Sequence, residues 1–489
     1  MHAANQSVNA LSLQALKKCL PVLLCVLLLG GCATRPINSS ITQVDLNLGY
    51  RNLRPQPALH QESQDTMVIL AFSGGGTRAA AFSYGVLEAL RDIEVVNEDG
   101  KKTRALDRVN LITGVSGGSF TALSYGLYGE KIFNFYDADF LKRDVQGELI
   151  SRAINPLNWT HLASSGWGRS ELAAELYDEI LFHGATYADL EKAGGPIILA
   201  SATNITSGAG FTFDQGYFDY LCSDLNSVPI SRAAASSSAV PFALSPVTFN
   251  NYGGDCKFKS PEYLSEFTNP SEMPRPAARI IKELHDLQSY QDSKNNPYVH
   301  LVDGGLSDNL AMRQILEFLQ GLEAMRLAGK KTPLDNLKRI IVFVVNSLST
   351  PSTDWNKSPS GPGSIELLIK ATGVPIDHYS YEEVEALKDT QARWKSMQKL
   401  RNSKLFANNK NVELERIIDT PNIDLRTINV AFSQLKDVQE FEYLNGLPTS
   451  LTLPPEAVDR LRAAAKSIIL ESPDFKQILK DGNLKLVRK

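Results

Sequence analysis

A serine between glycines is the residue of this sequence best suited to nucleophilic chemistry. Ser116 lies in the segment Gly-Val-Ser-Gly-Gly, directly after a largely apolar run. A strand that passes through Gly-x-Ser-x-Gly into a helix presents one hydroxyl at a sharp turn, where Gly114 and Gly118 leave room for tight backbone and for a substrate. The following helix directs its free amides and positive dipole end toward that hydroxyl. Ser116 is therefore the best candidate for a nucleophile.

A glycine-rich turn follows another predicted strand, the apolar run 67–72. Gly74, Gly75 and Gly76 offer consecutive backbone amides at the start of a predicted helix, a geometry suited to a negatively charged oxygen. Arg78 adds a positive charge nearby. The pattern lacks the Lys and Ser/Thr of a phosphate loop and the glycine spacing of a dinucleotide site, so we interpret it as an oxyanion turn.

A carboxylate ends a third predicted strand, where Asp303 follows the run 299–302 and begins Asp-Gly-Gly. In a parallel sheet the carboxyl ends of the strands share one edge, at which ligands bind. We therefore expect Asp303, Ser116 and the glycine-rich turn to meet at that edge. Each motif alone is common in proteins, whereas the three together at strand ends are far more specific.

The combination resembles the patatin-like phospholipase family. Its motifs occur in the family's order over about residues 66–315: Gly-Gly-Gly-Thr-Arg at 74–78, Gly-Val-Ser-Gly-Gly at 114–118, the small-residue helix at 235–241 and Asp-Gly-Gly-Leu-Ser-Asp-Asn at 303–309. Ser73 and Ala79 depart from the usual residues but flank the oxyanion turn without removing its amides. The resemblance implies a Ser116–Asp303 dyad without histidine, in which Asp303 accepts the serine proton and the Gly75 and Gly76 amides stabilise the oxyanion. Arg78 helps there by its charge or by holding the turn, or else forms a surface ion pair.

A conventional Ser-Asp-His triad is the alternative within serine hydrolases. The chain order Ser, Asp, His leaves only His378 after Asp303. His378 lies in a predicted loop with no strand before it, and His300 alternates onto the opposite face of its strand. Both histidines are therefore interpreted as structural.

Alternating strands, turns and helices predict an α/β fold with a mostly parallel central sheet and helices on both faces. The resemblance implies the patatin-like three-layer arrangement. We predict a catalytic domain over residues 66–348, with insertions at about 130–195 and 257–298, and a mainly helical C-terminal region over 349–489 that carries no interpretable motif.

The N-terminus has the pattern of a secretory signal. Lys17 and Lys18 precede a short apolar run that ends in Leu-Gly-Gly-Cys at Cys32. This ending resembles the bacterial lipobox, which implies that residues 1–31 are removed and that Cys32 is lipidated. The polar segment 32–65 is then a tether, and Ala33 in place of aspartate suggests the outer membrane. An ordinary signal with an incidental cysteine is the alternative.

Composition and residue spacing argue against several classes of partner. The chain of 489 residues has a net charge of -4 and no basic tract, which argues against nucleic acid. No His, Cys, Asp or Glu cluster has metal-ligand spacing, so neither metal nor cofactor is expected. In an oxidising compartment Cys222 and Cys256 can form a disulfide, with two separate buried thiols as the alternative.

The resemblance implies a membrane-anchored enzyme that hydrolyses acyl esters of lipids, with phospholipid as the favoured substrate. The same dyad serves acyl transfer to another acceptor and thioester hydrolysis. The alternative hypothesis outside the enzymes is a non-catalytic lipoprotein that binds lipid or a partner protein. Labelling of Ser116 by a fluorophosphonate separates this hypothesis from the enzymes.

Overall fold

The structure is a computed structural model of the chain. It describes residues 35–52, 65–96, 100, 102–162, 164, 167–260, 278–327, 336–351, 353, 355–357, 359, 361–404, 406, 421–482 and 485–487. The predicted signal at 1–31 and Cys32 lie outside the described residues.

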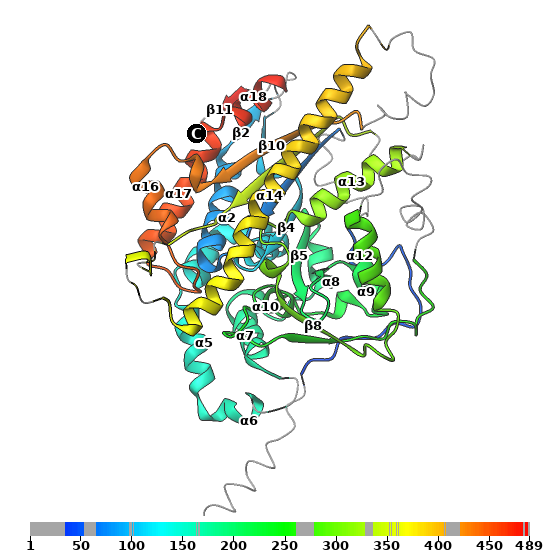
Figure 1. Cartoon of the computed structure of the whole chain (residues 1–489), viewed down its shortest axis with the longest axis vertical. Coiled ribbons are helices and arrows are strands. Elements are labelled where there is room, and N and C mark those ends of the chain that lie inside the picture. The colour runs from blue at the N-terminus through cyan, green and yellow to red at the C-terminus, as the bar shows by residue number, and fades with distance from the viewer. Residues whose placement is uncertain are drawn as a thin grey trace, which may run out of the picture.

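An eight-stranded sheet forms the centre of the fold (Figure 1), in the order β10-β9-β1-β4-β5-β8-β7 with β6 paired to β5. The strands are β1 (Thr66–Phe72), β4 (Val109–Val115), β5 (Ile197–Asn204), β6 (Gly210–Thr212), β7 (Val247–Asn250), β8 (Tyr298–Asp303), β9 (Arg339–Asn346) and β10 (Asp424–Ala431). Five of them, β10, β9, β1, β4 and β5, pair in parallel. The prediction of a mostly parallel sheet is confirmed.

Strand β8 corrects the prediction that Asp303 lies at the carboxyl end of a parallel strand. β8 runs antiparallel to β5 and pairs only with the last three residues of β5. In this pairing Asp303 lies opposite Ala202. Val115, the last residue of β4, pairs with Ser201, the neighbour of Ala202. Asp303 therefore reaches the level of Ser116 from the opposite direction, because β8 enters the sheet from beyond the end of β5.

The two faces of β1 belong to different hydrophobic clusters, as expected for a strand buried on both sides. Val68, Leu70 and Phe72 belong to the larger cluster, which contains side chains from α2 (Gly76–Asp92), α3 (Gly117–Tyr128) and α17 (Pro455–Glu471). Ile69 and Ala71 belong to the second cluster, with side chains of α13 (Arg313–Leu327) and α14 (Ser364–Arg401). Helices thus cover both faces of the sheet, and the predicted fold class is confirmed.

The C-terminal region completes the central sheet. Strand β10 pairs with β9 along its whole length, and α17 packs against α2. The remaining elements are α16 (Val438–Asn445), α18 (Pro473–Asp481) and β11 (Lys485–Val487), which pairs with β2 (Glu94–Val96) beside β3 (Lys102–Arg104). The predicted boundary at residue 348 therefore divides one sheet, a long-range pairing that local sequence patterns do not encode.

The predicted insertions contain short helices. The first holds α4 (Ile132–Tyr136), α5 (Val145–Ile154), α6 (Trp159–Leu162), α7 (Arg169–Tyr177) and α8 (Tyr187–Ala193). After β5 and β6 come α9 (Gln215–Tyr220) and α10 (Ile230–Ser237), and the described part of the second insertion forms α12 (Ala278–Ser289).

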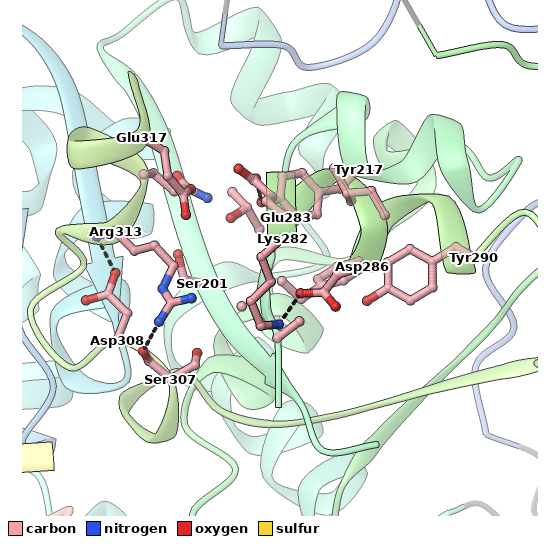
Figure 2. Close-up of a pocket in the computed structure, with 16 residues that line it drawn as sticks. Ser201, Tyr217, Lys282, Glu283, Asp286, Tyr290, Ser307, Asp308, Arg313 and Glu317 are labelled. Atoms are coloured by element: carbon pink, nitrogen blue, oxygen red, sulfur yellow. Dashed lines mark hydrogen bonds and ion pairs between the residues drawn. The ribbon is translucent and has the colours of Figure 1, made fainter. Parts of the chain in front are cut away.

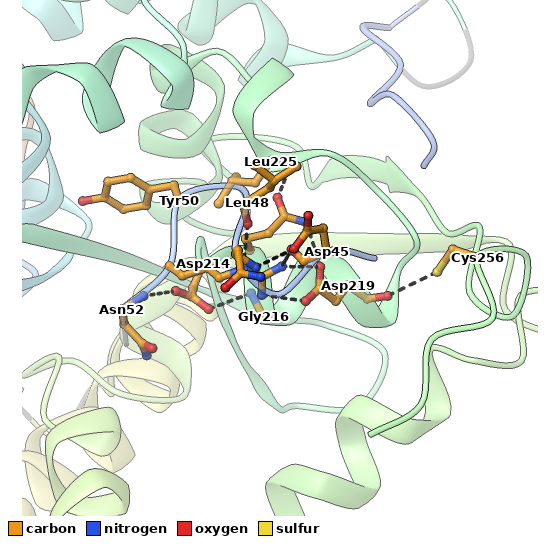
Figure 3. Close-up of polar contacts among 12 residues, drawn as sticks. Asp45, Leu48, Tyr50, Asn52, Asp214, Gly216, Asp219, Leu225 and Cys256 are labelled. Atoms are coloured by element: carbon orange, nitrogen blue, oxygen red, sulfur yellow. Dashed lines mark hydrogen bonds and ion pairs between the residues drawn. The ribbon is translucent and has the colours of Figure 1, made fainter. Parts of the chain in front are cut away.

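Residues 35–52, part of the predicted tether, pack on the domain (Figure 3). Arg51 forms an ion pair with Asp219 at 2.7 Å, and the Asn52 amide donates to Asp214 Oδ2 at 2.7 Å. Tyr50 is buried, and its hydroxyl accepts from the Ile198 amide at 2.6 Å. This part of the segment is therefore held against the domain.

A disulfide lies beside the same segment. Cys222 and Cys256 are bonded across 34 residues of sequence, and both side chains are buried. The amide of Ile41 donates to the Cys222 carbonyl at 2.8 Å. The bridge therefore joins the end of α9 to the chain that leaves β7, next to the packed N-terminal segment.

Candidate active site

The turn at Ser116 has the strained backbone of a nucleophile elbow. Strand β4 ends at Val115, Ser116 adopts φ 49° and ψ −121°, and α3 begins at Gly117. A positive φ at a non-glycine residue stores strain that the surroundings must compensate. Neighbouring backbone explains the flanking glycines, because a Cβ at Gly114 would lie 2.9 Å from Ser119 Cα and one at Gly118 would lie 2.6 Å from the Phe72 carbonyl oxygen.

Ser116 and Asp303 meet through their side chains. The Ser116 hydroxyl donates to Asp303 Oδ2 at 2.9 Å, and both residues are buried. Asp303 Oδ1 accepts from the Gly305 amide at 2.8 Å, so its second oxygen is held by the turn that follows it. The structure therefore places the two predicted dyad residues in direct contact, with the carboxylate oriented toward the hydroxyl.

Burial makes Asp303 a stronger base than an exposed aspartate. Desolvation raises the pKa of Asp303 from 3.8 to about 6, while the hydrogen bonds from Gly305 and Ser116 lower it. A base of higher pKa accepts the serine proton more readily, and at neutral pH the group is still mostly ionised.

A serine on the small-residue helix holds the backbone of Ser116, the candidate nucleophile. Ser237 of α10 donates through its hydroxyl to the Ser201 carbonyl at 2.6 Å and accepts from the Ser116 amide at 2.9 Å. This bridge fixes the backbone of Ser116 against β5. The sequence indicated the helix as a family motif but gave no role to Ser237, because its partners come from two distant strands.

The glycine-rich turn corrects one member of the predicted oxyanion hole. The Gly74 amide donates to the Asn309 carbonyl at 2.9 Å, so this amide is already used. Gly75 and Gly76 have φ angles of 137° and 62°, which an L side chain rarely adopts, and Gly76 begins α2. The amides of Gly75 and Gly76 thus remain the candidate donors. Glycine is nevertheless required at position 74, because a Cβ there would lie 2.5 Å from Asn309 Oδ1.

Arg78 is buried and holds the turn in place. Its guanidinium donates to the carbonyls of Ser347 and Leu447 at 2.7 and 2.9 Å and to Thr449 Oγ1 at 3.1 Å. Burial lowers the pKa of Arg78 to about 10, so the group stays charged at neutral pH. The contacts favour a positioning role over the surface ion pair considered from sequence.

Ser73, one of the two departures from the family pattern, contributes to the same arrangement. Its hydroxyl lies 3.0 Å from the Ser347 hydroxyl and accepts from the Ser347 amide at 2.9 Å. Ser347 Oγ in turn donates to the Gly74 carbonyl at 3.0 Å. The serine therefore fixes the turn to the end of β9.

The dyad opens into a cavity of about 620 Å³. One side comes from the catalytic loops and from Val240, Pro241 and Phe242 after α10. Another part of the wall comes from Leu348, the last residue of the predicted catalytic domain, and from the C-terminal region, including Ile376. The sequence analysis did not predict this part of the wall, because none of its residues forms a recognisable motif.

His378 and His300, the two histidines considered for a triad, lie apart from the contact between Ser116 and Asp303. His378 lies inside α14, which continues through Pro375, so the predicted loop around it is wrong. Its side chain is exposed, whereas its neighbours Ile376 and Asp377 line the cavity. His300 Nδ1 lies 2.9 Å from Thr248 Oγ1 on β7, away from Asp303 as the strand alternation predicts.

A second, smaller cavity of about 70 Å³ is lined in part by Ser307 and Asp308, which follow Asp303 in the sequence (Figure 2). Glu283 and Glu317 face it, and Tyr217 donates to Glu283. Burial and the neighbouring Glu283 raise the pKa of Glu317 well above its usual range. Within the described ranges, no group of three or more His, Cys, Asp or Glu side chains is placed to hold a metal ion.

Comparison with known proteins identifies the family. The model of patatin-like phospholipases matches residues 70–316. Human GIVD cytosolic phospholipase A2 aligns at 12% identity and a TM-score of 0.40, covering 85% of this chain and 60% of that enzyme. VipD from Legionella pneumophila aligns at 12% identity and a TM-score of 0.26, covering 93% of this chain and 73% of that one.

The chain thus corresponds to less than two thirds of the human enzyme's length. No curated protein matches it at a significant level of similarity. The family match begins within β1, ends within α13 and contains both the glycine-rich turn and the dyad. The chain belongs to the patatin-like phospholipase family.

Proposed function

We propose that the protein is a serine hydrolase that cleaves carboxylic esters of phospholipids with a Ser116–Asp303 dyad. The observation that carries the proposal is the 2.9 Å hydrogen bond between Ser116 Oγ and Asp303 Oδ2 at an open cavity of about 620 Å³. Family membership supports a lipid acyl ester as the substrate, and the apolar side chains of the cavity wall suit an acyl chain.

Acylation begins when Ser116 Oγ attacks the ester carbonyl and its proton passes to Asp303. The carbonyl oxygen becomes an oxyanion, which the amides of Gly75 and Gly76 stabilise. Loss of one such donor typically lowers kcat by ~10²–10³. When the intermediate collapses, the protonated Asp303 returns its proton to the leaving alkoxide, and the acyl group stays on Ser116.

Deacylation repeats these steps with water. Asp303 accepts a proton as water attacks the acyl-enzyme, and the fatty acid leaves when the Ser116 hydroxyl is restored. No histidine is needed in either half of the cycle, because the same carboxylate acts as base and then as acid.

We also propose that the enzyme is a lipoprotein of a bacterial outer membrane, anchored through Cys32. The signal-like segment 1–31 and its Leu-Gly-Gly-Cys ending support this anchor. Within the described residues, no helix is long and apolar enough to cross a membrane. Mass analysis of the mature N-terminus tests the anchor, and a mature chain without an acylated Cys32 would contradict it.

The catalytic proposal is tested by a fluorophosphonate probe together with lipid product profiling. Wild-type protein is expected to be labelled at Ser116 and to release fatty acid and lysophospholipid from phospholipid vesicles. Ser116→Ala should abolish both signals while it retains the wild-type circular dichroism spectrum. Absence of labelling in folded wild-type protein would favour the non-catalytic binding protein instead.

A further inference from the structure

A cluster of large apolar side chains is exposed on the segment 145–162, which we call the α5–α6 projection. Ile150, Ile154, Leu157 and Trp159 are 55%, 66%, 81% and 56% exposed. Single exposed apolar residues are ordinary on protein surfaces, whereas four within ten residues form a patch that indicates an interaction site. Figure 1 shows α6 at the lower end of the molecule, protruding beyond α5 and α7.

The projection has a defined conformation. Ile150 and Ile154 are four residues apart on α5 and therefore share one helix face. Asn155 Oδ1 accepts from the Leu157 amide at 3.1 Å, and Asn158 Nδ2 donates to the Arg152 carbonyl at 2.9 Å. These bonds shape the turn between the helices, so that Leu157 is held in its exposed position.

The projection is connected at both ends to segments that line the cavity of the dyad. At its start, Gln146 Oε1 accepts from the Leu451 amide at 3.2 Å, and the nearby Thr449 lines the cavity. After its end, the Ser170 amide donates to Ser245 Oγ at 3.1 Å. Ser245 follows shortly after Phe242, a cavity-lining side chain that is itself exposed. The two flanks of the projection are thus hydrogen-bonded to stretches of chain that also supply lining residues of the cavity.

Two arginines, one on the projection and one just before it, are paired within the protein. Arg143 forms an ion pair with Glu148 at 2.6 Å, and Arg152 forms one with Glu179. The projection therefore offers apolar surface without a free cluster of positive charge. An apolar surface of this kind can bind at the boundary between lipid headgroups and acyl chains through the area that it buries there.

The N-terminal segment starts on the same side of the domain. Arg35 Nη1 donates to the Thr248 carbonyl at 3.0 Å, and Arg232 donates to the same carbonyl at 2.7 Å. Arg232 also forms an ion pair with Glu171 of α7, the helix that follows the projection. Cys32 precedes Arg35 by three residues, so a lipid on Cys32 would be attached to the chain at most ~11 Å from Arg35.

We propose that the α5–α6 projection is a docking element for a phospholipid bilayer, and this inference rests on the proposed function. Ile150, Ile154, Leu157 and Trp159 enter the boundary between headgroups and acyl chains. Docking sets the cavity mouth against the bilayer, so that a lipid reaches Ser116 without crossing water. The lipid anchor and the projection then hold the same side of the enzyme on the membrane.

The first test measures binding without turnover. In a Ser116→Ala background, partition onto phosphatidylcholine vesicles is followed by sedimentation. Ile154→Ser, Leu157→Ser and Trp159→Ser together should lower the partition coefficient by ~10² or more, since one large apolar side chain contributes about a tenfold step. Val438→Ser on α16 is the matched control, because Val438 is 64% exposed outside the patch. It should leave partition unchanged.

The second test separates docking from chemistry. With Ser116 intact, the triple variant should hydrolyse a soluble short-chain ester as the wild type does, but lose activity on vesicles in proportion to binding. Partition should also change little with salt, because ionic attraction contributes little. Equal partition of variant and wild type would overturn the docking proposal. A variant that changes only the oligomeric state would do the same, because the patch would then cover a second copy.

A wild-type protein that hydrolyses no ester, soluble or vesicular, would refute the proposed function. The sedimentation experiment still decides the docking proposal in that case, since it needs no turnover.

Discussion

Asp303→Asn tests two effects of the carboxylate: its proposed role in catalysis and the destabilisation of the fold by its buried charge. The substitution keeps the size of the side chain and removes its charge. Oδ1 remains an acceptor for the Gly305 amide, and the new amide group can donate to Ser116 Oγ. Because both native contacts have a substitute, the change in stability should reflect mainly the loss of a buried charge.

The magnitude follows from the raised pKa. Burial moves the pKa of Asp303 from 3.8 to about 6. Each unit corresponds to 1.36 kcal/mol, so the ionised carboxylate destabilises the fold by about 3 kcal/mol at pH 8. The folded state binds the proton more tightly than the unfolded state, so this loss is absent below about pH 4 and develops as the pH rises to about 6. Asp303→Asn should therefore be more stable than wild type by about 1–3 kcal/mol at pH 8, with the difference shrinking toward pH 4.

Urea unfolding at several pH values, followed by tryptophan fluorescence, measures this difference. Asp214, whose pKa burial also raises to about 6, is present in both proteins and cancels in the comparison. The variant should also hydrolyse the ester ~10²–10⁴-fold more slowly than wild type. For wild type, kcat/KM should fall as the pH drops below about 6, because Asp303 becomes protonated. The reasoning is refuted if the variant is no more stable than wild type at pH 8, or if the difference is the same at pH 4.

Four further variants test other parts of the site and fold. Ser237→Ala should lower kcat about tenfold and stability by about 1–2 kcal/mol in urea unfolding, because the Ser116 amide loses its partner. Arg78→Lys keeps the charge but cannot reach three acceptors at once, so unfolding should become easier by about 1–3 kcal/mol; equal stability would contradict the positioning role. Replacing Cys222 and Cys256 by alanine should cost about 2–4 kcal/mol, and intact-mass analysis of unreduced wild type should reveal no free thiol at these positions. His378→Ala should retain most ester hydrolysis, and a folded but inactive variant would disprove the histidine-free dyad.

The strand, turn and helix around Ser116 were predictable because their signals are local. An apolar run, two glycines and a helix-forming segment occupy adjacent positions around Ser116, and the structure has β4, the elbow and α3 in that order. The glycines at 114 and 118 were expected to make room for tight backbone, and the close approach of Ser119 and Phe72 is the physical reason. Such features depend on neighbouring residues and therefore need no knowledge of the sheet.

The other members of the site depend on long-range pairing. The sequence predicted a strand before Asp303 but not that β8 runs antiparallel, since strand direction is set by connections across the whole sheet. The Gly74 amide is taken by the Asn309 carbonyl, 235 positions later in the chain. His378 was predicted to lie in a loop, yet α14 continues through Pro375 and contains His378. The direction of β8 and the contact of Gly74 both depend on tertiary contacts that no local pattern contains.

The buried Arg78 explains why the site cannot be confined to residues 66–348. A guanidinium in the protein interior needs acceptors for its donors, and two of the three acceptors, the Leu447 carbonyl and Thr449 Oγ1, belong to the C-terminal region. The Thr77 amide at the start of α2 likewise donates to the Ser450 carbonyl at 2.8 Å. The segment 447–450 therefore sets the backbone of the turn that carries the candidate oxyanion donors. The motifs of the first two thirds of the chain supply the reacting groups, and the last third holds the turn in the conformation that those groups require.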